Sequence, residues 1–272
     1  MDAGQARLDG KVVVVTGGTQ GLGEAIVRLF AERGAQGIVI CGRNTANGRA
    51  VAAELGKNNC RAEYVQADLA DLAQTRNIVA TADRVFGRID VLVNAAGMTD
   101  RGTVFDTSPD LFERMMAVNL RAPFFLIQDA AKIMRREKIA GTIVNIQSMS
   151  ALGGQPFLTP YSVSKGALAT LTKNEAFALM PWRIRVNGLN LGWMATPGED
   201  RVMRYYHGAQ DGWLEKAAAE QPFGRLIDPN EAARAVAFLA SEESGMMTGV
   251  NVDYDQTVVG CWETAPHPTP PV

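Results

Sequence analysis

Residues 12–23 read VVVVTGGTQGLG, and this stretch decides the fold. Four consecutive valines are typical of a β-strand that is buried on both of its faces. Beyond the glycines, apolar residues recur at helical spacing over residues 25–30, and Gly34 ends the pattern. The stretch therefore predicts a strand, a glycine-rich turn and a helix.

The glycine-rich turn indicates a loop that binds the phosphates of a dinucleotide. Gly17, Gly21 and Gly23 allow positive φ and let the backbone approach a ligand closely. The N-terminus of the helix that follows offers free N–H groups and a partial positive charge. The alternative is an ordinary strand-to-helix turn that uses glycines for flexibility. A Walker loop is excluded, because no Gly-Lys-Ser/Thr follows.

Outward from this stretch, apolar runs typical of strands alternate with helical periodicity. The predicted strands are residues 12–15, 37–41, 61–66, 91–94, 142–147, 184–189 and 250–253. Strands that alternate with helices imply right-handed crossovers and a parallel sheet covered on both faces. We therefore expect an α/β fold: a single doubly wound Rossmann-type domain over residues 1–263, with about seven parallel strands.

Three helices and two irregular segments complete the predicted organisation. Long helices are expected over residues 111–134 and 161–180, and a last one over 230–240, after a cap and first turn at Asp228-Pro229. Residues 192–220 interrupt the alternation and are rich in aromatic side chains. They are expected to form a lid over the substrate, or else a helix pair packed on the body or on another subunit. Residues 264–272 contain four prolines in nine positions and predict an extended tail.

Composition excludes several function classes. The formal net charge is −2, which gives no electrostatic case for nucleic acid or an anionic membrane as a partner. No run approaches the length of a membrane span, and the N-terminus lacks the apolar core of a signal peptide. The three cysteines, Cys41, Cys60 and Cys261, form neither a metal-ligand pattern nor a disulfide framework. We therefore expect a soluble protein of the cytoplasm that holds no metal.

A tyrosine and a lysine supply the strongest chemical signal. Tyr161 and Lys165 are four residues apart within a predicted helix, so both side chains lie on one face. Ser148 precedes Tyr161 by thirteen residues, at the end of a predicted strand. A nearby lysine cation lowers the pKa of a phenol, and a phenol so tuned can exchange a proton with an alcohol or carbonyl oxygen. The alternative for the pair alone is two ordinary helix residues.

Together these motifs resemble the short-chain dehydrogenase/reductase family. Residues 16–23 match its Thr-Gly-x-x-x-Gly-x-Gly loop, and residues 94–97, Asn-Ala-Ala-Gly, match its Asn-Ala-Gly segment. The resemblance spans about residues 8–255 and implies an oxidoreductase that interconverts a secondary alcohol and a ketone by hydride transfer. Two departures are Leu191, where the family has proline, and residues 254–256, where the family has Asp-Gly-Gly.

The resemblance also implies roles for individual residues. The expected catalytic residues are Asn119, Ser148, Tyr161 and Lys165. Tyr161 would be the general acid and base, Ser148 would orient the reacting oxygen, and Asn119 would hold a water that links Lys165 to solvent. The expected cofactor-binding residues are Gly17, Thr19, Gln20, Gly21, Leu22, Gly23, Arg43, Asp68, Leu69, Asn94, Ala95, Gly97, Tyr161, Lys165 and Thr196. Asp68 has the alternative of capping a helix that begins near Leu69.

The choice between NADP and NAD depends on the end of the second strand. An acidic residue there binds the ribose 2′-hydroxyl of NAD, and this chain has none. Gly42 leaves room and Arg43 supplies a cation suited to a 2′-phosphate. The sequence therefore favours NADP. NAD remains the alternative, because Gln20 is neutral where many NADP-dependent relatives are basic, and Arg43 could stack on adenine.

The substrate is a small molecule whose class the sequence leaves open. The predicted substrate residues are Met149, Gln155, Trp193 and His207, which place hydrogen-bonding groups beside aromatic walls. That mixture favours a sugar or polyol. The alternatives are a 3-ketoacyl thioester or a lipophilic keto compound, and, in other classes, a cofactor-binding regulator without catalysis or an interaction scaffold.

A homo-oligomer, most simply a tetramer, is expected as the assembled state. The helices over 111–134 and 161–180 carry more apolar side chains than one sheet face needs. Those expected to remain for a second subunit are Phe124, Phe125, Ile127, Leu168, Leu171, Phe177 and Leu179.

Overall fold

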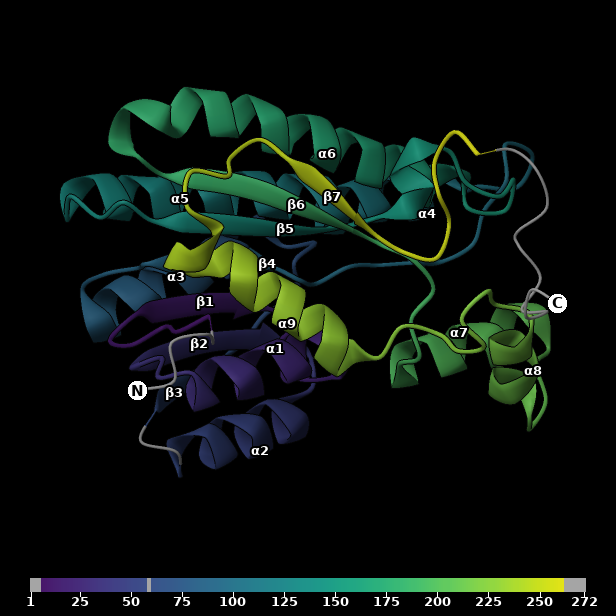
Figure 1. Ribbon diagram of the computed structural model, residues 1–272, viewed down its shortest axis with the longest axis horizontal. Helices are drawn as coiled ribbons and strands as arrows, with labels where there is room; N and C mark the ends of the chain where they lie inside the picture. Colours follow the sequence, from purple (N-terminus) through teal and green to yellow (C-terminus); the bar gives the residue numbers. More distant parts are fainter. Residues whose placement is uncertain (1–5, 58–59, 262–272) are drawn as a thin grey trace, which may run out of the picture.

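The structure is a computed structural model that describes residues 6–57 and 60–261. The predicted tail, residues 264–272, lies outside the described residues. A seven-stranded parallel sheet with the order β3-β2-β1-β4-β5-β6-β7 confirms the expected fold class (Figure 1). Its strands are β1 (Val12–Thr16), β2 (Gly37–Gly42), β3 (Arg61–Gln66), β4 (Val91–Asn94), β5 (Thr142–Ser148), β6 (Arg185–Leu191) and β7 (Asn251–Tyr254).

Helices cover both faces of the sheet. They are α1 (Gly21–Glu32), α2 (Thr45–Gly56), α3 (Leu72–Phe86), α4 (Pro109–Met116), α5 (Ala122–Arg136), α6 (Thr159–Leu179), α7 (Pro197–His207), α8 (Trp213–Ala219) and α9 (Pro229–Ala240). One core lies between the sheet and α1, α2 and α9, and a second core lies between the sheet and α3, α5 and α6. None of the described helices is both long and apolar enough to span a bilayer.

The unbroken valine run of β1 is explained by this layering. Val13 and Val15 point into the core on the α1 side, whereas Val14 points into the core on the α3 side. All three are fully buried. Neither face of a central parallel strand contacts solvent, so its sequence does not alternate between apolar and polar residues and is continuously apolar.

The helix predicted over residues 111–134 is in fact two helices joined by a π-helical turn. The turn spans Ala117–Arg121 and has Asn119 at its centre. An extra residue in one turn changes the periodicity too little to be read from an apolar pattern, and such turns often mark functional sites.

The alternative role of Asp68 as a helix cap is wrong. Helix α3 starts at Leu72, and Asp71 caps it by accepting from the N–H groups of Ala73 and Gln74 at 2.8 and 3.0 Å. By contrast, Asp228 caps α9 as predicted, accepting from the N–H of Asn230 at 2.8 Å.

Residues 192–220 form α7 and α8, which lie together beyond the carboxyl ends of the strands, at the right of Figure 1. Thr196 caps α7, since its hydroxyl accepts from the N–H of Glu199 at 3.1 Å. Trp193 and Trp213 stack with ring centroids 6.2 Å apart, and the indole of Trp213 donates to Asp200 at 2.8 Å. The first residue of α8 therefore contacts both α7 and the segment that precedes it.

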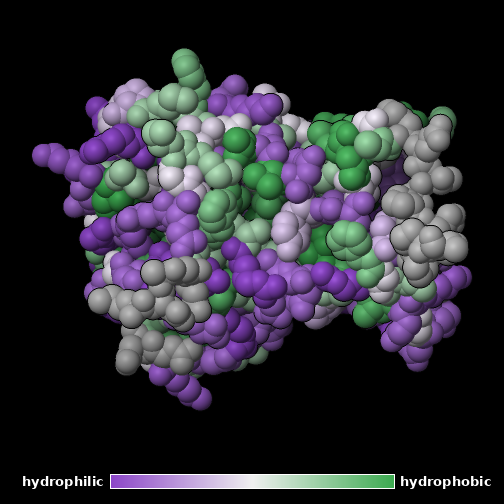
Figure 2. Space-filling view, viewed as in Figure 1, coloured by the Kyte–Doolittle hydropathy of each residue, from purple (hydrophilic) through white to green (hydrophobic). Residues whose placement is uncertain are grey.

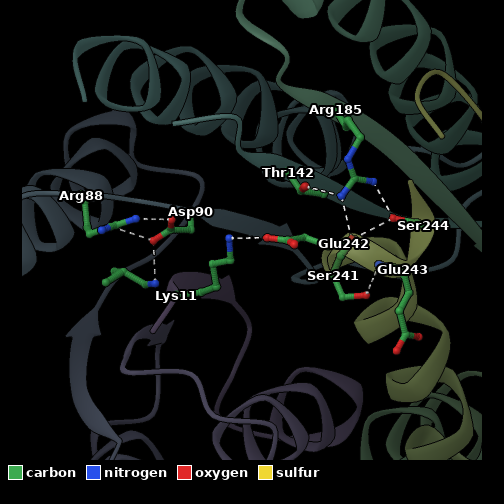
Figure 3. A network of polar contacts seen from close by, with 10 residues as sticks. Lys11, Arg88, Asp90, Thr142, Arg185, Ser241, Glu242, Glu243 and Ser244 are labelled. Atoms are coloured by element: carbon green, nitrogen blue, oxygen red, sulfur yellow. Dashed lines mark hydrogen bonds and ion pairs between the residues drawn. The ribbon is translucent and has the colours of Figure 1, made fainter. Parts of the chain in front are cut away.

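Polar contacts connect the amino-terminal ends of the strands, on the side of the sheet opposite to the carboxyl ends (Figure 3). Asp90 accepts from Arg88 at 2.6 Å and from the backbone N–H of Val12 at 2.9 Å. Arg185 donates to Thr142 at 2.8 Å and to Ser244 at 2.6 Å. With the strand starts tied to one another, the carboxyl ends keep a fixed register, and the predicted site residues gather there.

Candidate active site

The loop between β1 and α1 has a shape that only glycine permits. A Cβ on Gly23 would collide with the carbonyl oxygen of Gly17, and one on Gly17 would lie 3.0 Å from Cα of Ala96. Gly17 and Gly21 have positive φ, 70° and 56°. Gln20, which precedes α1, makes no side-chain cap, so the first N–H groups of the helix stay open to an anion. The loop therefore fits the diphosphate of a dinucleotide.

Gly42, at the end of β2, makes room for a protein side chain. A Cβ there would lie 2.5 Å from Oγ1 of the buried Thr19. That it also leaves room for a 2′-phosphate stays a prediction. Arg43 beside it is exposed, and its side chain makes no ion pair or hydrogen bond with the residues that the structure describes. The guanidinium is thus open to a ligand.

Asp68 and Leu69 follow β3, close to Arg43. The carboxylate of Asp68 pairs with Arg114 at 2.9 Å and accepts from the N–H of Ala70 at 3.0 Å. Partial burial opposes ionisation, but these two bonds and the charge of Arg43 outweigh it and lower the pKa of Asp68. Leu69 itself is buried in the core. An ionised carboxylate therefore faces the end of the sheet where an adenosine would lie.

The segment after β4 packs against the glycine loop. The N–H of Ala96 donates to Oγ1 of Thr16 at 3.1 Å. Asn94 is buried and donates to Asn145 at 2.8 Å, while its own Oδ1 has no hydrogen-bond partner among the described residues. Thr196 approaches from the other side, 3.7 Å from where a Cβ on Gly21 would lie. The glycine loop, the segment after β4 and Thr196 thus form a cradle at the strand ends, whereas Leu69 lies in the core.

The four predicted catalytic residues also meet. Lys165 donates from Nζ to the carbonyl oxygen of Ile146 at 2.8 Å, two residues before Ser148, and Nζ lies 5.8 Å from the ring centroid of Tyr161. Ser148 is close enough to Tyr161 to influence its pKa. A Cβ on Gly97 would lie 3.5 Å from Nζ of Lys165. Strand β5, helix α6 and the loop after β4 therefore converge on one point.

Asn119 holds the segment after β4 against α6. Its Oδ1 accepts from the N–H of Met98 at 2.8 Å, and its Nδ2 donates to the carbonyl oxygen of Met98 at 2.9 Å and to Ser164 at 3.0 Å. The amide is fully engaged, so its side chain positions the neighbouring segments. That Asn119 holds a water stays a prediction.

Burial sets the protonation states of the pair on α6. It raises the pKa of Tyr161; the nearby Ser148 hydroxyl and the charge of Arg101 oppose this rise, and Glu199 adds to it. Burial also lowers the pKa of Lys165 to about 8. The pKa of Tyr161 thus moves in the direction opposite to the expected lowering, because desolvation of the phenol outweighs the groups that oppose it, and Lys165 is not among those groups.

Comparisons with known proteins agree with this geometry. The profile of a family described as enoyl-(acyl carrier protein) reductase matches residues 17–256. A solved structure of a short chain dehydrogenase/reductase family protein superposes with a TM-score of 0.79 at 34% identity, covering 92% of this chain and 97% of the other. The chain belongs to the short-chain dehydrogenase/reductase family.

Three relatives indicate the chemistry of this dehydrogenase/reductase. An NADP-dependent (R)-specific alcohol dehydrogenase of Lentilactobacillus kefiri is 33% identical, over 92% of this chain and 96% of its own. A 3-alpha-(or 20-beta)-hydroxysteroid dehydrogenase of Mycobacterium tuberculosis is 36% identical, over 93% and 92%. An L-rhamnose 1-dehydrogenase (NAD(P)(+)) of Azotobacter vinelandii is 33% identical, over 90% and 95%. The chain is an oxidoreductase that uses NAD(P).

The predicted substrate residues of this dehydrogenase/reductase are only partly brought together. Trp193 donates to Glu199 at 2.9 Å, and His207 accepts from Arg101 at 3.1 Å. Gln155 is exposed, and Met149 lies in the turn after Ser148; neither makes a side-chain hydrogen bond with these residues. Sequence reasoning missed Arg101 and Glu199, because nothing in their local pattern separates them from ordinary surface charges.

The two departures from the family pattern are neighbours in space. Leu191 pairs with Tyr254 across β6 and β7, and a Cβ on Gly192 would collide with the carboxylate of Asp255. Asp255 therefore packs over the backbone at the point where the chain leaves β6 for α7. In this dehydrogenase/reductase, the two sequence changes form one local contact.

Proposed function

We propose that this protein interconverts a secondary alcohol and a ketone, with Tyr161 as the general acid and base. The observation that carries the proposal is the convergence of Tyr161, Ser148 and Lys165 beside the glycine cradle. NAD(P), when bound, supplies or accepts the hydride. Because burial raises its pKa, Tyr161 carries its proton at neutral pH and can donate it to a carbonyl oxygen.

The other side chains of the site have positioning roles. Ser148 accepts from the N–H of Ser150 at 3.1 Å and acts on the phenol of Tyr161, so its hydroxyl proton would be shared with the reacting oxygen. Lys165, held by Ile146, would reach the ribose hydroxyls of the cofactor. Within a single domain over residues 1–263, residues 192–220 would act as a lid. Hydrogen bonds from Arg201 to Gln20 at 3.4 Å and from Tyr206 to Asp100 at 2.7 Å support closure over the site.

Cofactor-dependent turnover tests this function directly. Purified protein is assayed with NAD and NADP against a panel of alcohols, sugars, polyols and keto compounds, following the absorbance of the reduced nicotinamide. We expect turnover with at least one alcohol or ketone and one cofactor. Cofactor binding without turnover on the whole panel would instead support a regulator that keeps the fold without catalysis.

NADP is the proposed cofactor, and Arg43 is the residue that would select it. Replacing Arg43 with Ala should weaken NADP binding by one to two decades and change NAD binding little. A charge-assisted hydrogen bond contributes roughly 1.5–3 kcal/mol, and only NADP carries the 2′-phosphate. Dissociation constants from quenching of tryptophan fluorescence measure the effect. Arg234→Ala, an exposed arginine on α9, is the matched control, and equal losses for both cofactors would show that Arg43 only stacks.

The protein is also proposed to form a closed homo-oligomer, most simply a tetramer, in the cytoplasm. Phe177 on α6 is 77% exposed and Phe124 on α5 is 41% exposed. Ile127 and Leu168, expected at an interface, are instead core residues. Figure 2 shows apolar surface over β7, the last strand of the sheet. Free thiols at Cys41, Cys60 and Cys261 support a reducing compartment.

Light scattering at micromolar concentration measures the assembly. We expect a mass near four times the 29.3 kDa of the chain. Phe177→Ser should shift the distribution toward smaller species, whereas Phe105→Ser, at a 97% exposed position in the loop before α4, is the control. A fully active monomer would contradict the assignment of α5 and α6 as interface helices.

A further inference from the structure

A charged pair that catalysis does not use lies beside Tyr161. Arg101 comes from the loop after β4, and Glu199 from the first turn of α7. Their side chains are only 14% and 19% exposed. Asn119 bonds the loop that carries Arg101 through Met98, and Thr196 caps α7 beside Gly21, so both side chains come from segments that border the site. Their charges also act on the phenol of Tyr161. Surface charges would not be buried this far without a task or a partner.

Neighbouring groups hold Arg101 in place but leave one end of it free. Its Nη1 donates to the carbonyl oxygen of Thr99 at 2.8 Å and its Nε donates to His207 at 3.1 Å. The guanidinium also lies over the ring of Phe157, 5.6 Å from the centroid. No described residue accepts a hydrogen bond from Nη2. The arginine is therefore fixed, with an unused pair of N–H donors.

Glu199, like Arg101, is held at one end of its charged group and has another atom without a hydrogen-bond partner among the described residues. Its Oε1 accepts from the indole N–H of Trp193 at 2.9 Å, and among the described residues nothing donates to its Oε2. Nη2 of Arg101 lies 3.9 Å from Oε1, which is too far for a hydrogen bond. The pair thus presents an open donor and an open acceptor side by side, between the rings of Phe157 and Trp193.

The chemistry of the pair selects its ligand. A carboxylate would be repelled by Glu199 and an ammonium by Arg101, but a neutral hydroxyl can accept from the arginine and donate to the glutamate at once. Two flanking aromatic rings suit the C–H surface of a sugar or alditol. A lipophilic ketone would leave Nη2 of Arg101 and Oε2 of Glu199 without hydrogen-bond partners, which a site built for hydrogen bonds penalises.

We infer that Arg101 and Glu199 are specificity-determining residues that bind a hydroxyl group next to the reacting carbinol, so that the substrate is a neutral polyhydroxylated alcohol such as a sugar or an alditol. The inference rests on the proposed function of Tyr161, whose substrate it narrows. It assigns to the lid helix α7 a direct part in recognition, since Glu199 lies in its first turn.

Substrate pairs that differ in neighbouring hydroxyls test the inference. The probes are glycerol, mannitol and rhamnose, compared with isopropanol, cyclohexanol and a hydroxysteroid. Glu199→Gln keeps an acceptor for Trp193 but removes the charge, and Arg101→Met keeps the stem over Phe157. Each variant should lower the ratio of kcat/KM for polyol over simple alcohol by about 10–100-fold, mainly through KM. The ratio cancels any effect that a variant has on the proton transfer common to both substrates.

Asp211→Asn is the matched control, because it makes the same kind of change in residues 192–220 at a position that is 97% exposed. Thermal melting shows that each variant is folded. Wild-type preference for isopropanol, cyclohexanol or the steroid, or an unchanged ratio in both variants, would overturn the inference while the proposed function stands. Absence of turnover on every probe, with NAD and with NADP, would overturn both.

Discussion

Replacing Tyr161 with Phe is expected to lower kcat by about 10²–10⁴-fold, the usual contribution of a general acid or base. The ring and its packing remain, while the phenol beside Ser148 and Lys165 is removed. Cofactor affinity should change little, because the cradle is built from the glycine loop and the segment after β4. Steady-state kinetics and a cofactor titration measure the two effects separately.

The pH profile adds an independent check on Tyr161. Burial raises the pKa of Tyr161, so its protonated form persists at neutral pH. Ketone reduction should therefore be supported at neutral pH, and alcohol oxidation should accelerate as the pH rises and the phenol loses its proton. Tyr205→Phe, at an exposed position on α7, is the control. A Tyr161→Phe enzyme with a rate close to that of the wild type would remove Tyr161 from the mechanism.

Replacing Lys165 with Met is expected to abolish most turnover and yet to stabilise the folded chain. The side chain is 4% exposed, and burial lowers its pKa from the ordinary 10.5 to about 8. Below pH 8, this difference lowers the free energy of unfolding of the wild type by about 3 kcal/mol relative to its value above pH 10.5. When the pKa of a group is lower in the folded state than in the unfolded state, the protein loses stability as the pH falls toward the folded-state pKa. The wild type should therefore gain stability as the pH rises from about 8 to 10.5.

Urea unfolding of both proteins across this pH range measures the effect. The advantage of Lys165→Met should be largest below pH 8 and should shrink toward pH 10.5. Lys132→Met, at an exposed position on α5, is the matched control and should show no such trend. A constant difference at all pH values would mean that Lys165 contributes through packing alone.

The fold was largely predictable because its strongest signals are local. The valine run, the glycine loop and the alternation of strands with helices fix the doubly wound class, and each predicted strand exists. The π turn at Asn119 was missed because one extra residue leaves the apolar pattern almost unchanged. The false cap at Asp68 arose because two aspartates, three residues apart, both suit the role, and only the backbone decides between them.

The candidate site was predictable for those residues whose place in space follows from the order of the motifs along the chain. The glycine loop, Asn119, Ser148, Tyr161 and Lys165 meet because parallel strands end on one edge. Arg101 and Glu199 were not found, because their meeting depends on where α7 turns back over the loop after β4. The pKa of Tyr161 was predicted in the wrong direction, because desolvation depends on burial, which spacing along a helix does not reveal.

The strand order also constrains how the sheet can be assembled during synthesis. β2 adds to β1, β3 adds to β2, and then β4 adds to the free side of β1, followed by β5, β6 and β7 in turn. Each new strand finds an open edge, and none has to be inserted between two that have already paired. A chain leaving the ribosome can thus build the sheet outward from β1, with the nucleotide-binding half formed before the residues for proton transfer emerge.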